Sequence, residues 1–183
     1  GAAAPGRTLV WVNRQGKEEP LGAPPDNVYR YPKISPDGTR VALSVGPGTN
    51  DDIYVWDVVR KTLTRLTFVE GRDIVPIWTP DGKRIVFYSV AGDSGLYWKA
   101  ADGTGEVERL ISAPGRLFFP YSWSSDGKIL LMDEMLTTTN SDIAMLSMDG
   151  DRTRKPLLKE ERASEVEPMI SPDGRWMAYT SNE

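Results

Sequence analysis

The sequence of 183 residues contains neither cysteine nor histidine. Without cysteine there are no disulfides and no thiolate metal sites, and without both residues a bound metal must be a hard cation held by oxygen ligands. The missing histidine also removes the usual base that activates a serine nucleophile. The stretch GDSG at Gly92–Gly95 matches the letters around a trypsin-like nucleophile, but we interpret it as a turn between two strands.

Other signatures of catalysis or cofactor binding are missing as well. The glycine-rich stretches at Gly46–Gly48 and Gly103–Gly105 lack the further glycine and the lysine of a phosphate loop. The stretch MDGDR at Met148–Arg152 lacks the remaining ligands of a calcium loop. No spacing singles out a pair of carboxylates for glycoside hydrolysis. We therefore predict that the chain is not an enzyme and holds no metal or other cofactor.

The charge pattern and the hydropathy argue against two classes of partner. Lysine and arginine total 22 against 26 acidic residues, which gives a net charge of −4 with the two signs interspersed. A nucleic-acid-binding protein normally carries a basic stripe, and none is visible. No apolar run approaches the roughly 18 residues that span a membrane. The opening residues GAAAPGR also lack the basic and apolar regions of a signal peptide.

One short phrase, a turn followed by an apolar run, occurs four times. The copies are ISPDGTRVAL from Ile34, IWTPDGKRIVF from Ile77, SWSSDGKILLM from Ser122 and MISPDGRWMAY from Met169. Their turn glycines are 44, 45 and 47 residues apart and are Gly38, Gly82, Gly127 and Gly174. In such a turn the aspartate accepts a local backbone hydrogen bond and the glycine takes positive φ without steric cost. A period in this range indicates a repeat architecture.

Each repeat contains four short segments separated by turns. In the second repeat these are DIVPIWT, KRIVFYSV, LYWKA and EVERLIS. The second segment is almost entirely apolar, so it predicts a strand that is covered on both faces. Four such strands form an antiparallel meander, and radial stacking of meanders buries their faces in a β-propeller. Pro156, in the last segment of the third repeat, suits an outermost edge strand.

The predicted fold class is therefore all-β, a single β-propeller domain (1–183) of four-stranded antiparallel blades with about four blades' worth of strands. Complete repeats are expected at 28–68, 73–112 and 117–158, and half-blades at 8–22 and 165–183. The half-blades can join within one chain as a four-bladed ring, or join a second copy as an eight-bladed, two-fold ring. An open fragment is the remaining alternative. We favour the homodimer, in which an isologous arrangement closes every strand edge.

The repeated phrase, followed by DIYVWDV and LTRLT, resembles the Pro-Asp-Gly repeat of TolB-type propellers, which are WD-like. More narrowly, four segments are similar to propellers attached to bacterial serine/threonine protein kinases. These segments are TLVWVNRQGKEEPL, DIYVWDVVRKTLTRLTF, LYWKAADGTGEVERL and EPMISPDGRWMAYTSNE. The likeness runs from Leu9 to Glu183 and implies a non-enzymatic propeller for binding or sensing, commonly outside the cytoplasm. Similar repeats form the gating propellers of prolyl-oligopeptidase-like hydrolases. Trp56-Asp57 is a literal WD dipeptide, but true WD repeats pair it with an upstream Gly-His. Because this chain has no histidine, it is not interpreted as a true WD repeat.

The segments that enter the first strand of each repeat are expected to rim one mouth of the central channel. They are VYRYP, RDIVP, RLFFP and SEVEP, a mixed aromatic and charged set that suits a peptide or polar ligand. The predicted binding residues are Tyr29, Arg30, Tyr31, Asp73, Phe119, Glu165 and Glu167. The alternative is that these side chains plug the channel or face water. The aspartates of the repeated turn are explained by their position in the turn, so we do not interpret them as metal ligands. They are Asp37, Asp81, Asp126 and Asp173.

The sequence thus favours a non-catalytic propeller that serves protein–protein interaction or ligand sensing, with a protein or peptide as partner. The fold alone would not license a function, so this prediction rests on the repeat, the missing catalytic chemistry and the resemblance. The alternative is the accessory propeller of a larger enzyme, either a kinase sensor domain or a hydrolase gate. The resemblance alone favours an extracytoplasmic, periplasmic location.

Overall fold

The computed structural model describes residues 7–24, 27–136, 140–159 and 163–182. These residues form β-strands in chain order and include no helix that is long and apolar enough to cross a membrane. The first blade comprises β3 (Tyr29–Ile34), β4 (Arg40–Val45), β5 (Asp52–Asp57) and β6 (Thr62–Arg65). The second blade comprises β7 (Asp73–Trp78), β8 (Arg84–Ser89), β9 (Gly95–Ala100) and β10 (Glu108–Ser112). The third blade comprises β11 (Arg116–Trp123), β12 (Ile129–Leu136), β13 (Ser141–Ser147) and β14 (Arg154–Leu158).

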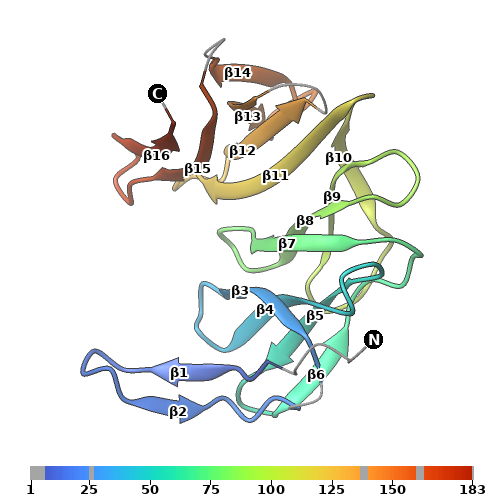
Figure 1. The fold of residues 1–183 in the computed structure, drawn as a ribbon, viewed down its shortest axis with the longest axis vertical. Coiled ribbons are helices and arrows are strands. Elements are labelled where there is room, and N and C mark those ends of the chain that lie inside the picture. The colour runs from blue at the N-terminus through green and yellow to red at the C-terminus, as the bar shows by residue number, and fades with distance from the viewer. Residues whose placement is uncertain (1–6, 25–26, 137–139, 160–162, 183) are drawn as a thin grey trace.

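Two smaller sheets lie at the ends of the molecule (Figure 1). The N-terminal half-blade pairs β1 (Val10–Val12) with β2 (Glu18–Pro20), and the C-terminal half-blade pairs β15 (Glu165–Ile170) with β16 (Met177–Ser181). Every neighbouring pair of strands is antiparallel, and each complete blade follows the simple order of first, second, third and fourth strand. The prediction of an all-β propeller built from four-stranded antiparallel blades is therefore confirmed.

Burial follows the position of a strand within its blade. The second strands are the most apolar segments of the chain, and β4 and β8 are buried at every position after the first. The fourth strands are the outermost, and β6 alternates between exposed and half-buried residues. Pro156 pairs with Ala144 in β14, where the outer side of the strand has no neighbour that needs an N–H donor. The sequence-based placement of this proline at an edge is confirmed.

The repeated turn has the same hydrogen bonds in every copy. Ser35 Oγ donates to Asp37 Oδ1 (2.6 Å) and accepts from the N–H of Arg40 (2.9 Å), while the N–H of Thr39 donates to Asp37 Oδ1 (3.0 Å). Equivalent serine or threonine pairs are Thr79–Asp81, Ser124–Asp126 and Ser171–Asp173. Gly82 has φ of +66°, as the turn requires. These hairpin turns project to the left in Figure 1.

The core runs through the junctions between blades. One apolar cluster joins the first and second blades, one joins the second and third, and one joins the N-terminal half-blade to the first blade. The cluster between the first and second blades includes Trp78, Phe87 and Ile53, all of them buried. Because each blade covers the face of the next, stability comes from nearest-neighbour contacts, as in other repeat folds.

The described strands form an open arc. The two half-blades lie at opposite ends of the long axis in Figure 1, and β15 contacts only the third blade among the complete blades. The chain therefore does not close a four-bladed ring on itself in this structure. Apolar side chains stay exposed at both ends: Ile34 is 56% exposed near β1, Trp176 is 71% exposed just before β16, and Tyr179 is 47% exposed on β16.

Candidate functional site

A bulge interrupts the first strand of each blade. The pairing with the second strand shifts its register between Arg30 and Lys33, between Ile74 and Ile77, and between Val166 and Met169. In all three cases the residue before a proline has a left-handed backbone, and these residues are Tyr31 (φ 53°), Val75 (φ 55°) and Glu167 (φ 60°). Such a conformation is uncommon for a bulky residue and often marks a functional site.

In the third blade the proline lies one residue further from the repeated turn than in the other repeats. The register of β11 against β12 shifts between Pro120 and Ser122, which leaves Tyr121 as the inserted residue. A bulge re-aims the side chain that it carries and leaves main-chain groups outside the ladder. The repeated bulges therefore make the first strands, β3, β7, β11 and β15, the most irregular surface of the blades.

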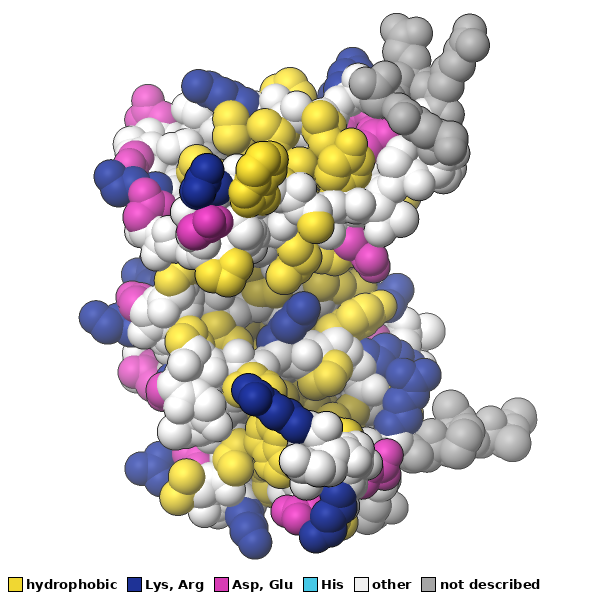
Figure 2. All heavy atoms as spheres, turned by 90° about the vertical axis from the view of Figure 1, so that its left-hand side faces the viewer, with side chains coloured by type: hydrophobic (Ala, Val, Ile, Leu, Met, Phe, Trp, Pro, Cys, Tyr) yellow, Lys and Arg dark blue, Asp and Glu magenta, His cyan; other side chains and the backbone are white. Residues whose placement is uncertain are grey.

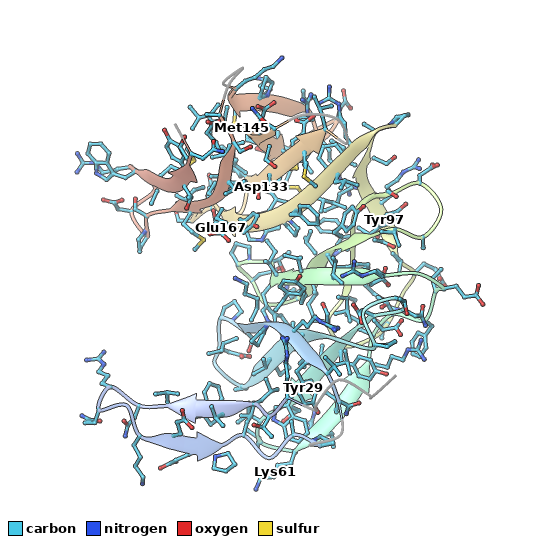
Figure 3. The ribbon with its side chains drawn as sticks, in the orientation of Figure 1. Tyr29, Lys61, Tyr97, Asp133, Met145 and Glu167 are labelled. Atoms are coloured by element: carbon cyan, nitrogen blue, oxygen red, sulfur yellow. The ribbon has the colours of Figure 1, made fainter. Side chains whose placement is uncertain are left out.

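The bulges gather four polar side chains from three sheets. Asp133, 4% exposed in β12, accepts a hydrogen bond from the N–H of Glu167 (2.9 Å), and the nearby hydroxyl of Tyr121 lowers the pKa of Asp133. Tyr31 of the first blade is 44% exposed, and it is the smallest of the causes that raise the pKa of Tyr121. Glu167 is exposed, and Figure 3 shows it beside Asp133. We call Tyr31, Tyr121, Asp133 and Glu167 the channel cluster.

The channel cluster is acidic and partly shielded from water, and this environment shifts the pKa values of its members. Burial raises the pKa of Asp133 to about 7, and the Glu167 carboxylate adds to the rise although the hydrogen bonds from Glu167 N–H and Tyr121 oppose it. Burial, and then the charges of Asp133 and Glu167, raise the pKa of Tyr121 well above its usual range. Titratable groups with such shifts are enriched at binding and catalytic sites, although structural networks also produce them.

The predicted binding residues do not all reach this surface. Tyr31 and Glu167 are exposed, whereas Tyr29, Asp73 and Glu165 are 3%, 3% and 1% exposed. Tyr29 donates to the carbonyl of Pro24 (2.6 Å) and lies well away from Glu167 in Figure 3. Burial raises the pKa of Asp73, in spite of hydrogen bonds from Ser89 and Thr67.

The other two predicted residues hold the scaffold together. Arg30 donates to the carbonyl of Gly46 (2.9 Å) and pairs with the buried Asp51 (3.1 Å). Phe119 is half-buried and packs against Tyr88 with ring centroids 5.0 Å apart. No observation tests the binding role of the seven residues, which stays a prediction. Of the seven, Tyr31 and Glu167 have exposed side chains.

The sequence analysis missed Tyr121 and Asp133. A signal for Asp133 was present, because KILLMDE places a carboxylate at the end of a run that predicts a strand covered on both faces. A buried carboxylate needs partners, so its position pointed to hydrogen bonds across a blade junction. Tyr121 carried no comparable signal, since its place at the bulge depends on the shift of Pro120 relative to the other repeats.

The turn aspartates and the GDSG stretch have local partners. Asp37 has its pKa lowered to about 2, first by the hydrogen bond from Ser35 and then by those from Thr39. Asp93, in the GDSG stretch, pairs with Arg109 (2.6 Å), and its carbonyl accepts from the hydroxyl of Tyr97 (2.7 Å). Within residues 7–24, 27–136, 140–159 and 163–182, no three acidic side chains are grouped so that they could hold a metal ion.

Comparisons with known proteins agree with this architecture. The chain is 27% identical to an uncharacterized peptidase (YuxL) of Bacillus subtilis, over 82% of this chain and 29% of the relative. It is 24% identical to the Tol-Pal system protein TolB of Helicobacter pylori, over 80% of this chain and 35% of the relative. The chain thus spans about a third of the length of these relatives.

Solved structures show the same fold at lower identity. TolB from Acinetobacter baumannii superposes with a TM-score of 0.68 at 22% identity, over 93% of this chain and 47% of that one. Prolyl oligopeptidase B from Galerina marginata superposes with a TM-score of 0.61 at 18% identity, over 85% of this chain and 25% of that one. The model of the TolB beta propeller domain matches residues 19–183. The chain therefore belongs to the TolB β-propeller domain family.

Proposed function

We propose that the chain is a non-catalytic propeller segment that binds a peptide, or an extended segment of a partner protein, along its first strands. The observation that carries this proposal is the channel cluster, in which polar side chains on or beside the bulges come from sheets far apart in the sequence. Tyr31 comes from β3, Tyr121 from β11 and Glu167 from β15. A site that draws on several blades is what the inner surface of a propeller offers to a ligand.

The chemistry of the cluster suits a peptide. Phenol rings provide apolar area with a polar end, so they contact side chains and hydrogen-bond to main-chain groups with little loss of rotamer freedom. The Glu167 carboxylate accepts hydrogen bonds from backbone N–H groups, and the bulges leave strand main chain free of its ladder. The chain has no histidine or cysteine to act as base or nucleophile, which supports a binding role over a catalytic one.

The test is a selection of random heptapeptides on the immobilised chain, followed by affinity measurements on the selected peptides. Tyr31→Asn and Glu167→Asn suit the left-handed backbone, since asparagine tolerates positive φ. Each is expected to weaken binding at least about tenfold, as a contact at the centre of an interface does. Phe68→Ala, which removes a 66% exposed side chain elsewhere, is the control and leaves affinity unchanged. No selected peptide, or equal affinities for all variants, contradicts the proposal.

A second candidate function is that of an accessory propeller in a larger enzyme. It is supported by the name of the Bacillus subtilis relative, an uncharacterized peptidase, and by the fold shared with prolyl oligopeptidase B. In this role the first strands would contact a substrate peptide, and another domain would catalyse the reaction. The reading frame around this sequence tests the idea, because a kinase or hydrolase domain next to it is expected. On resemblance alone, we also propose a location outside the cytoplasm.

We further propose that a second copy closes the ring, giving eight blades. The support is complementarity, because β15 and β16 are first and second strands of a blade while β1 and β2 are third and fourth strands. Pairing β16 with β1 of another copy would cover Ile34, Trp176 and Tyr179, which are now exposed.

Light scattering during size-exclusion chromatography tests this pairing. The expected mass is twice the 20.3 kDa of one chain. Trp176→Glu is expected to return it to one chain, whereas Val59→Glu, at a 77% exposed position in the first blade, leaves it unchanged. A wild-type mass near one chain contradicts the pairing.

A further inference from the structure

A cavity of about 510 Å³ opens between the second and third blades on the side that carries the hairpin turns. Its apolar walls are Pro80, Trp98, Trp123 and Met148. Its polar walls are Thr79, Asp81, Arg84, Ser125, Asp126, Gly127, Lys128 and Asp149. Figure 2 looks onto this side of the molecule and shows apolar side chains recessed between its upper and middle parts. We call this cavity the junction pocket. It is separate from the channel cluster.

The corresponding place at the junction of the first and second blades is filled by the chain itself. Arg40 lies over the ring of Trp78, with its guanidinium carbon 4.7 Å from the ring centroid. The same guanidinium donates to the carbonyl of Gly82 (3.0 Å), in the turn of the next blade. Trp78 Nε1 donates to the carbonyl of Lys33 (2.9 Å), and Gly82 packs near Pro36. This arrangement is a guanidinium site that the protein occupies with its own arginine.

The junction pocket repeats the walls of that site. Trp123 stands at the repeat position of Trp78, and Gly127 stands at that of Gly82. Gly127 lies near Pro80, just as Gly82 lies near Pro36. The aromatic face and the turn are therefore present at both junctions. The two junctions differ in what lies between the tryptophan and the turn.

The arginine at the repeat position of Arg40 lines the junction pocket but stacks on Trp98 and not on Trp123. Arg84 stands at the repeat position of Arg40, but its guanidinium lies over Trp98, 4.1 Å from the ring centroid. It also pairs with Glu108 (3.4 Å), which accepts a hydrogen bond from Trp98 Nε1 (2.8 Å). Arg152 of the third blade covers Trp98 as well, 4.9 Å from the centroid. These contacts keep Arg84 within its own blade.

Trp123 gives an independent sign that this junction is wider. Its Nε1 is buried and has no hydrogen-bond partner within the described part of the chain, whereas Trp78 Nε1 is bonded to the neighbouring blade. A buried indole N–H normally finds an acceptor. The interblade hydrogen bond that Trp78 makes at the first junction thus has no counterpart at Trp123 within the described residues.

The rim of the junction pocket favours a cation. The pKa values of Asp81 and Asp126 are lowered, first by hydrogen bonds from Thr79 and Ser124, so both carboxylates stay charged at neutral pH. Asp149 pairs with Lys128 (3.4 Å), and Arg84 pairs with Glu108. The positive groups of the rim are thus already matched, while the two turn carboxylates are not matched by an ion pair among the described residues.

The geometry points to an arginine-binding site: the junction pocket takes the guanidinium of an arginine side chain from a partner peptide or protein. The guanidinium lies over the face of Trp123, as Arg40 lies over Trp78. It donates to the carbonyl of Gly127, as Arg40 donates to Gly82. Planar guanidinium suits this place better than an ammonium group, because it stacks on an aromatic face and donates in its own plane at the same time.

The test is a titration of the chain with N-acetyl-arginine amide, followed by NMR of the tryptophan indole N–H signals. The Trp123 signal is expected to shift and saturate, and the Trp78 signal to stay in place because Arg40 already covers that ring. The citrulline analogue has the same shape without the charge and is expected to cause no saturable shift. Unmoved Trp123, equal movement of Trp78, or equal effects of the two probes would overturn the assignment.

Two variants sharpen this test without removing a core residue. Glu108→Gln releases Arg84 to compete for the junction pocket, so it is expected to weaken arginine binding at least about threefold, the size of one exposed cation–π contact. Tyr31→Asn changes the channel cluster and is expected to leave the Trp123 titration unchanged. Stronger binding by Glu108→Gln, or loss of the titration in Tyr31→Asn, contradicts a separate arginine site.

Discussion

The two inner junctions between blades are built from the same repeat positions but are closed differently. At the first junction the four residues in contact are Pro36, Arg40, Trp78 and Gly82. At the second junction their counterparts are Pro80, Arg84, Trp123 and Gly127. The first arginine crosses to the next blade, and the second stays within its own blade.

Two substitutions within the repeat account for this difference. Trp98 pairs with Glu108 across β9 and β10, and the corresponding pair in the first blade is Val55 with Thr64. Val55 and Thr64 offer no aromatic face and no charge, so Arg40 has its best partners in the next blade. A local change in the outer strands thus decides whether the arginine crosses to the next blade or stays within its own blade. The predictions below test this comparison.

Trp78→Ala is expected to be the most destabilising of these changes. Trp78 is 6% exposed, packs with Phe87 and donates to Lys33, so its loss should cost about 3–5 kcal/mol of unfolding free energy. Trp123→Ala is expected to cost less, because Trp123 is half-buried beside the junction pocket and makes no indole hydrogen bond within the described residues. Urea unfolding measures both. Equal losses would remove the difference between the junctions.

Gly82→Val and Gly127→Val are expected to have similar effects. Both glycines have left-handed φ, +66° and +71°, and each lies near a proline of the preceding turn. A β-branched residue there is strained, so each variant should lose about 1–3 kcal/mol. Thr104→Val, in an exposed loop, is the control. A large loss of unfolding free energy at only one of the two glycines would mean that the junctions differ in their turns and not in their arginines.

The third junction, between the third blade and β15, is expected to depend on pH. The carboxyl of Asp133 has a pKa of about 7 in the folded chain, whereas its ordinary value is 3.8, so the folded state holds the proton more tightly. The contribution of Asp133 to stability is therefore fully present below about pH 4 and is lost as the pH rises through about 7, by on the order of 1–2 kcal/mol.

Asp133→Asn is the variant that checks this dependence by urea unfolding at several pH values. It should flatten the curve between pH 4 and 8, because Tyr121 and Glu167 remain and only the titrating carboxyl is lost. A slope that persists in the variant would assign the effect to another group. The inner junctions, where Ser44 and Tyr88 stand at the position of Asp133, lack this carboxyl.

The smallest expected difference is that between Arg40→Ala and Arg84→Ala. Arg40 contributes a cation–π contact and a hydrogen bond across a junction, so its loss should cost about 1 kcal/mol. Arg84 is replaceable on Trp98 by Arg152, which already covers that ring, so its loss should cost about half as much. A larger loss for Arg84→Ala would mean that the second junction depends on it after all.

Much of the fold was predictable because the residues that define the repeat lie close together in the sequence. The Pro-Asp-Gly turn fixes one hairpin in each blade, and the apolar segments around it have the length of strands. Pro156 marked an outer strand for the same reason, since a proline cannot donate to a ladder on both sides. The open arc was not predictable, because the repeat pattern does not show which strands pair with the edges of the two half-blades.

The candidate site was harder to predict for a geometric reason. The sequence analysis treated all residues before the strand proline as equivalent and placed them together at the mouth of the channel. The bulges break the alternation of side chains, so Tyr31 and Glu167 are exposed while Tyr29 and Glu165 are buried. Left-handed φ before a proline is not a conformation that residue preferences favour, and it could not be expected from sequence.

The central claim, that a peptide ligand lies along the first strands, is tested most directly by amide hydrogen exchange. The measurement compares the chain alone with the chain saturated by a peptide selected on it. The account predicts slowed exchange in β3, β11 and β15, which carry Tyr31, Tyr121 and Glu167. Slowed exchange confined to the outer strands β6, β10 and β14, or none at all, would contradict it.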